Sequence, residues 1–310
     1  MSKKPRKAAA IDIGSNSCRL LIARQKDGKL VREYYDMRTT RLLEKVESNK
    51  ILTEAAERRT LTALRNFKQQ ISKRDICKIQ AVGTSALREV NNSQDFCHKI
   101  ENELSLPVQI ISGQEEAELV FAGVSSFPGR KVNMVIDIGG GSTETISQGN
   151  DGPIKALSMN IGAVRYTERY IDNPKELINK SDREKIYKKA RKYFAQSNSN
   201  LNNTNGIEFV FGVGGTITTL VAIAEHMEKY QPWKVENFSL TKTRVETITN
   251  FLSNKDIEER RRVPGLNPER ADVIVAGSLI LLAFMTGFSL DRIKVSDRGF
   301  LFGIISKYLL

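Results

Sequence analysis

Cysteine and histidine are scarce in this sequence and are not spaced to bind metal. Its 310 residues include three cysteines, Cys18, Cys77 and Cys97, and two histidines, His98 and His226. Cys97 and His98 are adjacent, and adjacent side chains do not normally share a zinc ion. The sequence therefore predicts three reduced thiols, as in a cytoplasmic protein, and no zinc site.

Long apolar segments are also few. The apolar run that follows the basic residues at 3–7 is broken at Asp12, so we expect no signal peptide. Residues 273–290 form one stretch of eighteen uncharged residues, near the lower limit for a membrane-spanning helix. Because this stretch contains glycine, serine and threonine and is flanked by Asp272 and Asp291, it predicts a buried helix in a globular domain instead.

Aromatic residues make up 7% of the chain and include one tryptophan. Basic residues outnumber acidic ones by 48 to 36, which gives a formal net charge of +12. Such a surface concentrates polyanions, including polyphosphate, nucleic acid and anionic membranes. Nucleic acid is the weakest of these because no zinc-finger or RNP-type motif is present. The length and the 40% hydrophobic content fit a globular protein of two domains.

The sequence is organised around residues 134–147, MVIDIGGGSTETIS. An apolar run that ends at an aspartate, three glycines and a second β-rich run predict strand, tight turn and strand. Glycine has no Cβ and readily takes a positive φ, so the amides of Gly139, Gly140 and Gly141 can point at one anion. Asp137 could hold a cation beside that anion. The alternative is a plain glycine hairpin.

Residues 7–24, KAAAIDIGSNSCRLLIAR, repeat this pattern. Three pairs of positions align, Asp12 with Asp137, Gly14 with Gly139 and Ser17 with Ser142. Two phosphate-type hairpins at this separation predict a duplicated domain, each half opening with its own loop.

Charged residues follow two further predicted strands, at the end where α/β proteins bind ligands. Arg88 follows strand 78–83 and is a candidate phosphate ligand, although a lone arginine can also form a surface ion pair. Glu115 and Glu116 begin a helix after strand 106–112. The helix dipole alone favours acids there, but such a carboxylate is also placed to act as a general base for water. Neighbouring residues on a helix diverge by about 100°, so only one of the two can face a ligand.

A third glycine element lies at 207–226, which reads as a buried strand, GVGGT and a helix. The amides of Gly214, Gly215 and Thr216 at the helix N-terminus predict a second type of anion or nucleotide site. The spacing is not G-x-G-x-x-G, so a dinucleotide fingerprint is not supported.

Several residues are expected to begin or end elements. Thr53 is expected to cap a helix over 54–71, and Asn267 with Pro268 to start the buried helix. The asparagine-rich residues 197–206 predict a surface loop. Pro128 and Gly129 are expected to separate the two halves.

Eight stretches resemble the exopolyphosphatase and guanosine pentaphosphate phosphatase family, within the actin, sugar-kinase and heat-shock ATPase superfamily. They are AAIDIGSNSCRLLIA, VGTSALREVNN, ISGQEEAELVFAGV, VIDIGGGSTE, MNIGAVRYTE, FGVGGT, PGLNPERADVIVAG and SDRGFLFG. The resemblance implies an α/β fold of two ribonuclease-H-like, actin-like ATPase domains, with mixed sheets flanked by helices and the active cleft between them. Domains over 1–127 and 128–297 are expected, with the last helix, 298–310, packing back on the first. The chain ends at Leu310 without the C-terminal HD-type helical region of longer members, as in a short two-domain form.

The resemblance also implies roles for individual residues. The first phosphate loop would contain Asp12, Gly14, Ser15, Asn16 and Ser17, and the second Asp137, Gly139, Gly140, Gly141, Ser142 and Thr143. Arg88 resembles the family's phosphate-binding arginine, and Glu116 its catalytic base. Asp12, Asp137 and Glu144 resemble the surroundings of Mg²⁺, and a monovalent cation such as K⁺ stays open as a second ion.

The expected activity is Mg²⁺-dependent release of the terminal phosphate of inorganic polyphosphate, with Glu116 as general base for the attacking water. Hydrolysis of pppGpp by the same chemistry is the nearest alternative. A phosphotransferase or ATPase related to sugar kinases, and a non-catalytic sensor of alarmone or polyphosphate, are further alternatives. A homodimer stays open, and no membrane partner is expected.

Overall fold

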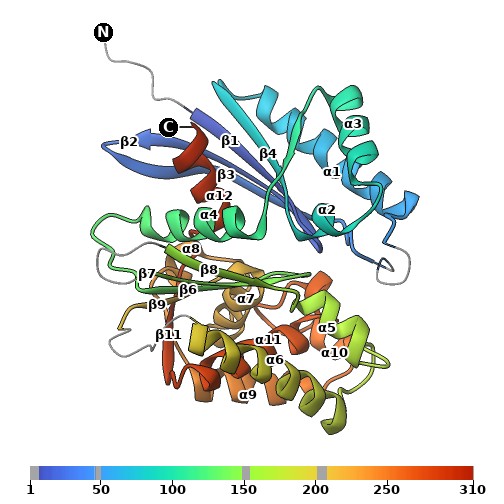
Figure 1. Cartoon of the computed structure of the whole chain (residues 1–310), viewed down its shortest axis with the longest axis vertical. Helices are drawn as coiled ribbons and strands as arrows, with labels where there is room; N and C mark the ends of the chain where they lie inside the picture. The colour runs from blue at the N-terminus through green and yellow to red at the C-terminus, as the bar shows by residue number, and fades with distance from the viewer. Residues whose placement is uncertain (1–6, 45, 47–49, 149–153, 201–207, 310) are drawn as a thin grey trace. The chain divides into compact units, whose positions relative to one another are not determined.

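The computed structural model describes residues 7–44, 46, 50–148, 154–200 and 208–309. The chain divides into two compact units (Figure 1). Unit 1 comprises Met1–Arg130 and Arg298–Leu310, and unit 2 comprises Lys131–Asp297. Each unit is built around its own mixed sheet.

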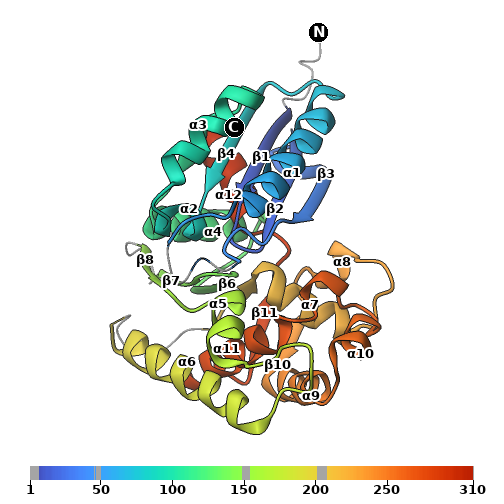
Figure 2. The same cartoon turned by 90° about the vertical axis from the view of Figure 1, so that its right-hand side faces the viewer.

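Unit 1 contains a five-stranded sheet in the order β3-β2-β1-β4-β5. Strands β1, β2 and β3 pair antiparallel, whereas β4 and β5 run parallel to β1. Helices α1 and α3 cover one face of the sheet, and α4 and α12 cover the other (Figures 1 and 2). The elements are β1 Lys7–Ile13, β2 Ser17–Lys26, β3 Lys29–Thr39, α1 Glu54–Ser72, β4 Lys78–Gly83, α2 Ser85–Glu89, α3 Ser93–Leu104, β5 Val108–Ile110, α4 Gly113–Ser125, α12 Phe300–Ile304 and a π-helical turn, Ile305–Leu309.

Unit 2 contains a six-stranded sheet in the order β10-β11-β9-β6-β7-β8. Its elements are β6 Met134–Ile138, β7 Thr143–Gln148, β8 Ile154–Met159, α5 Ala163–Tyr170, α6 Lys180–Asn200, β9 Val210–Val213, α7 Gly214–Ala224, α8 Pro232–Val235, β10 Ser239–Thr241, α9 Lys242–Ser253, α10 Ile257–Arg261, a 3₁₀ turn Pro268–Arg270, α11 Ile274–Gly287 and β11 Arg292–Val295.

The two sheets repeat one connectivity. In unit 1 a central strand, β1, pairs antiparallel with β2 and parallel with β4. In unit 2 the central strand β6 pairs antiparallel with β7 and parallel with β9 in the same way. The predicted duplication is therefore confirmed by the topology, and β10 is an addition at one edge of the second sheet.

Local sequence explains several element boundaries. The Thr53 side chain accepts a hydrogen bond from the Ala56 amide, so the predicted cap of α1 is confirmed. The expected start of the buried helix is wrong, because Asn267 caps the 3₁₀ turn and α11 begins only at Ile274. The buried guanidinium of Arg260 donates to the carbonyl of Ala271, the residue that follows this turn, at 2.8 Å.

The predicted loop at 197–206 is only partly described. Helix α6 extends to Asn200, so residues 197–200 of the predicted loop are helical. Residues 201–206 lie outside the described residues.

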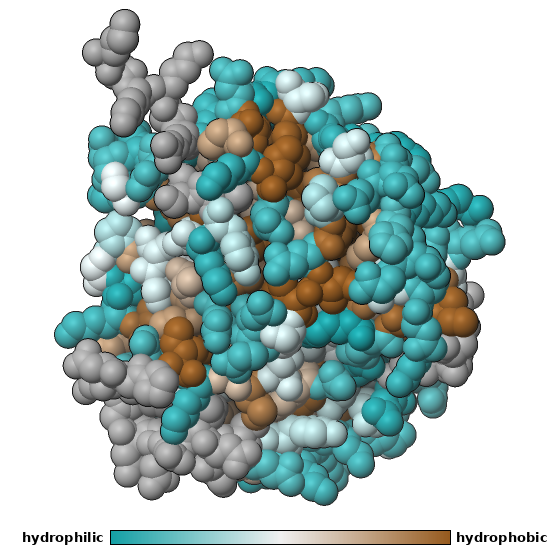
Figure 3. All heavy atoms as spheres, turned by 45° about the horizontal axis from the view of Figure 1, so that its top comes forward, coloured by the Kyte–Doolittle hydropathy of each residue, from teal (hydrophilic) through white to brown (hydrophobic). Residues whose placement is uncertain are grey.

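Each unit has its own apolar core. Helix α11 is the most apolar element of unit 2, and its side chains are buried among α5, α6, α7 and α9. The prediction of a buried helix is thus confirmed, and within the described parts of the chain no helix is long and apolar enough to cross a membrane. On the face shown in Figure 3, hydrophilic residues cover most of the surface, as expected for a chain with 27% charged residues.

Helices α4 and α12 pack closely because each has a glycine where the backbone of the other segment comes near. A Cβ on Gly303 of α12 would overlap the Leu119 carbonyl of α4. A Cβ on Gly123 of α4 would likewise overlap the Gly299 carbonyl. The C-terminal segment is thereby held directly against the helix that begins with Glu115 and Glu116.

Replacing Gly303 with alanine should destabilise unit 1, although alanine favours helix more than glycine by about 1 kcal/mol. The overlap with Leu119 should lower the free energy of unfolding by about 2–3 kcal/mol in urea titrations. Gly28→Ala is the control, because a Cβ there meets nothing within 4 Å and only its positive φ of 72° costs about 1 kcal/mol. Equal losses in the two variants would contradict the packing argument.

Candidate active site

Loop 1, residues 14–17, is a tight hairpin between β1 and β2. The Gly14 amide donates to the Ser17 carbonyl at 3.2 Å, and Ser15, Asn16 and Ser17 are buried. Within the described residues, the amides of Ser15 and Asn16 donate no backbone hydrogen bond. Buried backbone N–H groups are nearly always paired, so these two are available to an anionic ligand.

Loop 1 is held from behind by the chain that leaves β3. The Asn16 carbonyl accepts from the amides of Thr40 at 3.0 Å and Arg41 at 2.9 Å. The Ser15 carbonyl accepts from the Leu43 amide at 3.2 Å. With its carbonyls fixed in this way, the loop keeps its amides on the other side.

Loop 2, residues 139–142, has the same hairpin bond as loop 1. The Gly139 amide donates to the Ser142 carbonyl at 2.9 Å, which confirms the alignment of the two loops. Across the described chain, the amides of Gly140, Gly141 and Ser142 also lack an acceptor. Loop 2 therefore offers three backbone donors of the kind that loop 1 offers.

The N-terminus of α5 holds loop 2. The amides of Ala163 and Val164 donate to the carbonyls of Gly139 and Gly140, both at 2.9 Å. The Arg165 guanidinium donates to the Gly141 carbonyl at 2.8 Å through Nε. As in loop 1, neighbouring segments bind the carbonyls, while the amides of Gly140, Gly141 and Ser142 have no acceptor in the described chain.

The expected positive φ at residues 139–141 is wrong. Among the described glycines, positive φ values occur at Gly28, Gly129, Gly214 and Gly265. Close approach is the reason for glycine in this region instead. A Cβ on Gly139 would lie 3.1 Å from the Ser142 carbonyl oxygen, and one on Gly162 would overlap the Gly140 carbonyl.

Asp12 lies at the end of β1 and is 1% exposed. Its Oδ2 accepts two bonds from the Arg19 guanidinium, from Nε at 2.6 Å and from Nη2 at 2.5 Å. Burial raises the pKa of Asp12, and the neighbouring Arg19 charge opposes that rise only in part. Its Oδ1 is buried without a partner. A buried, unpartnered carboxylate oxygen is a suitable ligand for a hard cation such as Mg²⁺.

Asp137 and Glu144 are buried register partners on β6 and β7. Glu144 accepts from the Ser158 hydroxyl at 2.7 Å. A Cβ on Gly214 would overlap the Asp137 carboxylate, which, with its φ of 88°, explains why this position is glycine. No three His, Cys, Asp or Glu side chains in the described chain are grouped to hold a metal ion. Mg²⁺ commonly takes only one or two carboxylates from the protein and completes its shell with phosphate and water. A group of three acids is therefore not required, and the Mg²⁺ site stays a prediction.

Thr143 has a structural contact. Its side chain is fully buried, and its hydroxyl donates to the Ile161 carbonyl at 2.5 Å. The hydroxyl is therefore committed to the backbone that leads into α5, and the phosphate-binding role expected for Thr143 is left to its backbone.

The structure separates the two glutamates that begin α4. Glu115 accepts from the Ser112 amide at 3.0 Å and belongs to a capping box with Ser112. These bonds from Ser112 lower the pKa of Glu115. Glu116 points elsewhere and forms an ion pair with Arg88, with 2.6 Å between Nη1 and Oε2. Both side chains of this pair are mostly buried.

Arg88 is anchored at the end of the parallel strands. It lies on the short helix α2, directly after β4, and its Nη1 also donates to the Ile111 carbonyl at 3.2 Å. Arg88, Glu116 and loop 1 all belong to unit 1, whose strands β1 and β4 end side by side. Unit 1 thus combines unpaired amides, a guanidinium and a carboxylate that is not used for helix capping.

The third glycine element, at the start of α7, is shaped by its neighbours. The Thr216 side chain is buried, and a Cβ on Gly277 of α11 would come within 2.6 Å of it. The Arg270 guanidinium lies against Gly215, where an added Cβ would overlap it. A guanidinium at a helix N-terminus strengthens the case for an anion site at this position.

Three arginines next to the loops were not singled out from the sequence: Arg19, Arg165 and Arg270. Arg19 could have been found, because it lies two residues after Ser17 on the same face of a strand. Arg165 contacts Gly141 and Arg270 contacts Gly215, and in both cases the partners are far apart in the sequence.

The chain is similar to known proteins over almost its whole length. A profile described as the Ppx/GppA phosphatase family matches residues 21–310. The chain belongs to the Ppx/GppA phosphatase family. The family resemblance inferred from the motifs is therefore confirmed, as is the expectation of a hydrolase acting on phosphoanhydrides.

Individual relatives are similar over almost the whole chain. A bifunctional 3-dehydroquinate synthase/phosphatase of Fusobacterium nucleatum is 38% identical over 96% of this chain and 46% of its own, so this chain spans about half the length of that relative. The crystal structure of the Ppx/GppA family member of Aquifex aeolicus is 30% identical, with a TM-score of 0.81 and 97% of each chain covered. An exopolyphosphatase structure from Cytophaga hutchinsonii is 26% identical, with a TM-score of 0.85 and 97% of each chain covered.

These likenesses and the two sheets confirm the predicted fold class of a two-domain α/β protein of the actin-like ATPase type. The placement of the active cleft between the two units stays a prediction. The roles of individual site residues likewise stay predictions, and the contacts described above are the grounds for testing them.

Gly162→Ala should impair phosphate release more than it impairs folding. The added Cβ pushes on the Gly140 carbonyl, and displacing a catalytic loop by 1 Å can lower the rate by about 100-fold. We expect kcat/KM for phosphate release to fall by about that factor. Gly129→Ala, where nothing lies within 4 Å, should leave kcat/KM within about threefold of wild type. Wild-type kcat/KM in Gly162→Ala would show that loop 2 does not depend on this contact.

Proposed function

We propose that the protein is an exopolyphosphatase that releases terminal phosphate from inorganic polyphosphate by hydrolysis. The observation that carries this proposal is the pair formed by Glu116 and Arg88 in the unit that contains loop 1. Membership of a phosphatase family and the net charge of +12 support a polyanionic phosphate substrate.

Glu116 acts as the general base in this proposal. Glu115 is engaged in the capping box at the start of α4, whereas the Glu116 carboxylate forms the ion pair with Arg88. A carboxylate oriented in this way can accept a proton from a water molecule that attacks the terminal phosphorus. The new P–O bond forms to the water oxygen, and the P–O bond to the bridging oxygen breaks. The shortened chain leaves with the electron pair of that bond.

Backbone amides and Arg88 provide the electrostatic stabilisation. The amides of Ser15 and Asn16 bind oxygens of the terminal phosphoryl group. The remaining N–H groups of Arg88 bind the negative charge that spreads over the phosphoryl oxygens. Donors that are fixed before the reaction contribute most of the catalysis in phosphoryl transfer.

Mg²⁺ is the cofactor that these residues fit best. The buried, unpartnered Oδ1 of Asp12 is the ligand that the structure supports most directly, with Asp137 and Glu144 as the acids of the second loop. When bound, the ion neutralises charge on the phosphate chain. K⁺ stays open as an additional ion.

Glu116→Gln should lower kcat for phosphate release from polyphosphate by about 10²–10⁴-fold, because glutamine cannot accept the proton. Glu115→Gln is a matched control on the neighbouring residue. Glutamine at that position can still accept the bond from the Ser112 amide, so turnover and thermal stability should stay close to wild type. Turnover that is undiminished in Glu116→Gln, or equally diminished in both variants, would remove Glu116 from the role of base.

Hydrolysis of pppGpp is the second candidate. The observation that favours it is the Arg270 guanidinium against Gly215 at the N-terminus of α7, a suitable contact for a nucleotide phosphate. The phosphoryl chemistry is the same for both substrates.

Steady-state kinetics with polyphosphate, pppGpp and ATP, measured side by side, separate the candidates. We expect kcat/KM to be at least about tenfold higher for polyphosphate than for pppGpp, a difference of about 1.4 kcal/mol. A preference of that size for pppGpp would assign the protein to the alarmone reaction instead. ATP turnover that depends on an added sugar would indicate a phosphotransferase.

A further inference from the structure

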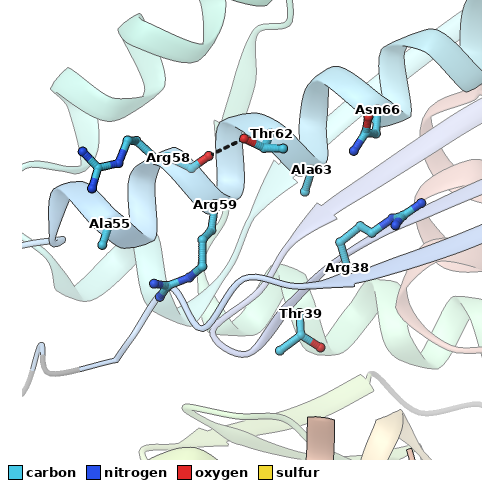
Figure 4. A pocket seen from close by; sticks show the side chains of 8 residues that line it. All are labelled: Arg38, Thr39, Ala55, Arg58, Arg59, Thr62, Ala63 and Asn66. Carbon is cyan, nitrogen blue, oxygen red and sulfur yellow. Dashed lines mark hydrogen bonds between the residues drawn. The ribbon is translucent and has the colours of Figure 1, made fainter. Parts of the chain in front are cut away.

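A pocket with a volume of about 500 Å³ lies in unit 1, between strand β3 and helix α1 (Figure 4). Strand β3 is the edge strand of its sheet, so the pocket opens along a free edge. Three arginines line it, Arg38 from β3 and Arg58 and Arg59 from α1. The other polar lining residues are neutral, and no acidic residue lines it.

The arginines differ in how firmly they are held. Arg38 pairs with Asp36 at 3.1 Å, and Arg58 lies 4.0 Å from Glu54 with both side chains largely exposed, 72% and 92%. The exposed pair of Arg58 and Glu54 contributes only about 0–1 kcal/mol, so a ligand can replace it at little cost, whereas the Asp36 side chain is mostly buried and holds Arg38 with two hydrogen bonds. Arg59 is fixed, because it donates to the Thr40 carbonyl at 2.8 Å and to Glu44 at 2.9 Å.

The spacing of the positive charges indicates the shape of the ligand. In Figure 4 the guanidinium groups of Arg58 and Arg59 lie at one end of the group of lining residues, and that of Arg38 lies at the other. A volume of about 500 Å³ is larger than one phosphate requires, so the pocket has room for a row of linked phosphates. Guanidinium groups bind phosphate oxygens in pairs, which suits such a chain.

The pocket is connected to loop 1 through the backbone. Its lining residue Thr39 is the register partner of Ser17, and neighbouring strands lie about 4.8 Å apart. Arg59 binds the carbonyl of Thr40, whose amide donates to the Asn16 carbonyl. A ligand that contacts Arg59 therefore touches the segment that holds loop 1 in place.

We propose that this pocket is a second anion site that binds an oligophosphate chain of several linked phosphates. Two sources share this chemistry, the distal part of a long substrate chain and a separate short oligophosphate. Assigning the ligand to the substrate rests on the proposed exopolyphosphatase function, whereas binding of an oligophosphate at the pocket does not.

The binding test uses inorganic tripolyphosphate and the full chain, without added divalent metal. Isothermal titration of wild type should show a class of sites in addition to the one at loop 1, and this additional class should be lost, or weakened at least tenfold, in the double variant Arg38→Gln/Arg58→Gln. The control is Arg65→Gln, which removes one guanidinium from the same helix outside the pocket lining. The control should match wild type. Identical titrations for the double variant and wild type, or an equal loss in Arg65→Gln, would overturn the proposal.

Hydrogen exchange locates the ligand independently of the variants. Tripolyphosphate should slow amide exchange in wild type at residues 38–43, and this protection should disappear in the double variant. Protection confined to loop 1 and its surroundings, unchanged in the double variant, would place the ligand at loop 1 alone and contradict a separate site.

Kinetics then distinguish the two sources. If the pocket holds the distal part of a substrate, the double variant should raise KM for long-chain polyphosphate at least tenfold and leave KM for tripolyphosphate unchanged. If it holds a separate oligophosphate, KM for both should be unchanged, and added tripolyphosphate should alter kcat for long chains in wild type only. A protein that binds tripolyphosphate at the pocket but hydrolyses none of these substrates would keep the site and refute the proposed function.

Discussion

Both glycine loops depend on hydrogen bonds to their carbonyl oxygens. In loop 1 the chain that follows β3 supplies the donors, and in loop 2 the N-terminus of α5 supplies them. A backbone whose acceptors are fixed on one side presents its N–H groups on the other, at a fixed orientation. The orientation of the loop amides therefore depends on segments outside the loops, the chain after β3 and the N-terminus of α5.

The start of α4 shows how one turn of helix separates two identical side chains. Glu115 completes a capping box with Ser112, which stabilises the helix and holds the Glu115 carboxylate at the helix N-terminus. Glu116, one residue later, is turned toward Arg88. Glu115 thus stabilises the helix, and the proposed role of base belongs to its neighbour Glu116. The capping bond fixes the start of the helix and with it the direction of the Glu116 side chain.

Sequence patterns predicted the parts that depend on local chemistry. The paired hairpins, the cap at Thr53 and the buried helix followed from apolar runs, glycines and capping residues, and all three are confirmed. The positive φ expected at loop 2 was wrong, and the close contacts lie at Gly139, where a Cβ would be 3.1 Å from the Ser142 carbonyl oxygen, and at Gly162, where a Cβ would overlap the Gly140 carbonyl. Strand β10 and helix α3 were not predicted, and the contacts of Arg165 and Arg270 join segments far apart in the chain. Local periodicity contains no information on such pairs.

The glycine contact between α4 and α12 has a consequence for synthesis on the ribosome. Unit 1 begins at the start of the chain but needs α12, which is made only after all of unit 2. The helix that carries Glu116 therefore emerges early and meets its packing partner last. Because domains generally fold in the order in which they are made, unit 2 can fold while unit 1 is still missing a helix. The proposed base therefore reaches its final surroundings only after α12 has been made.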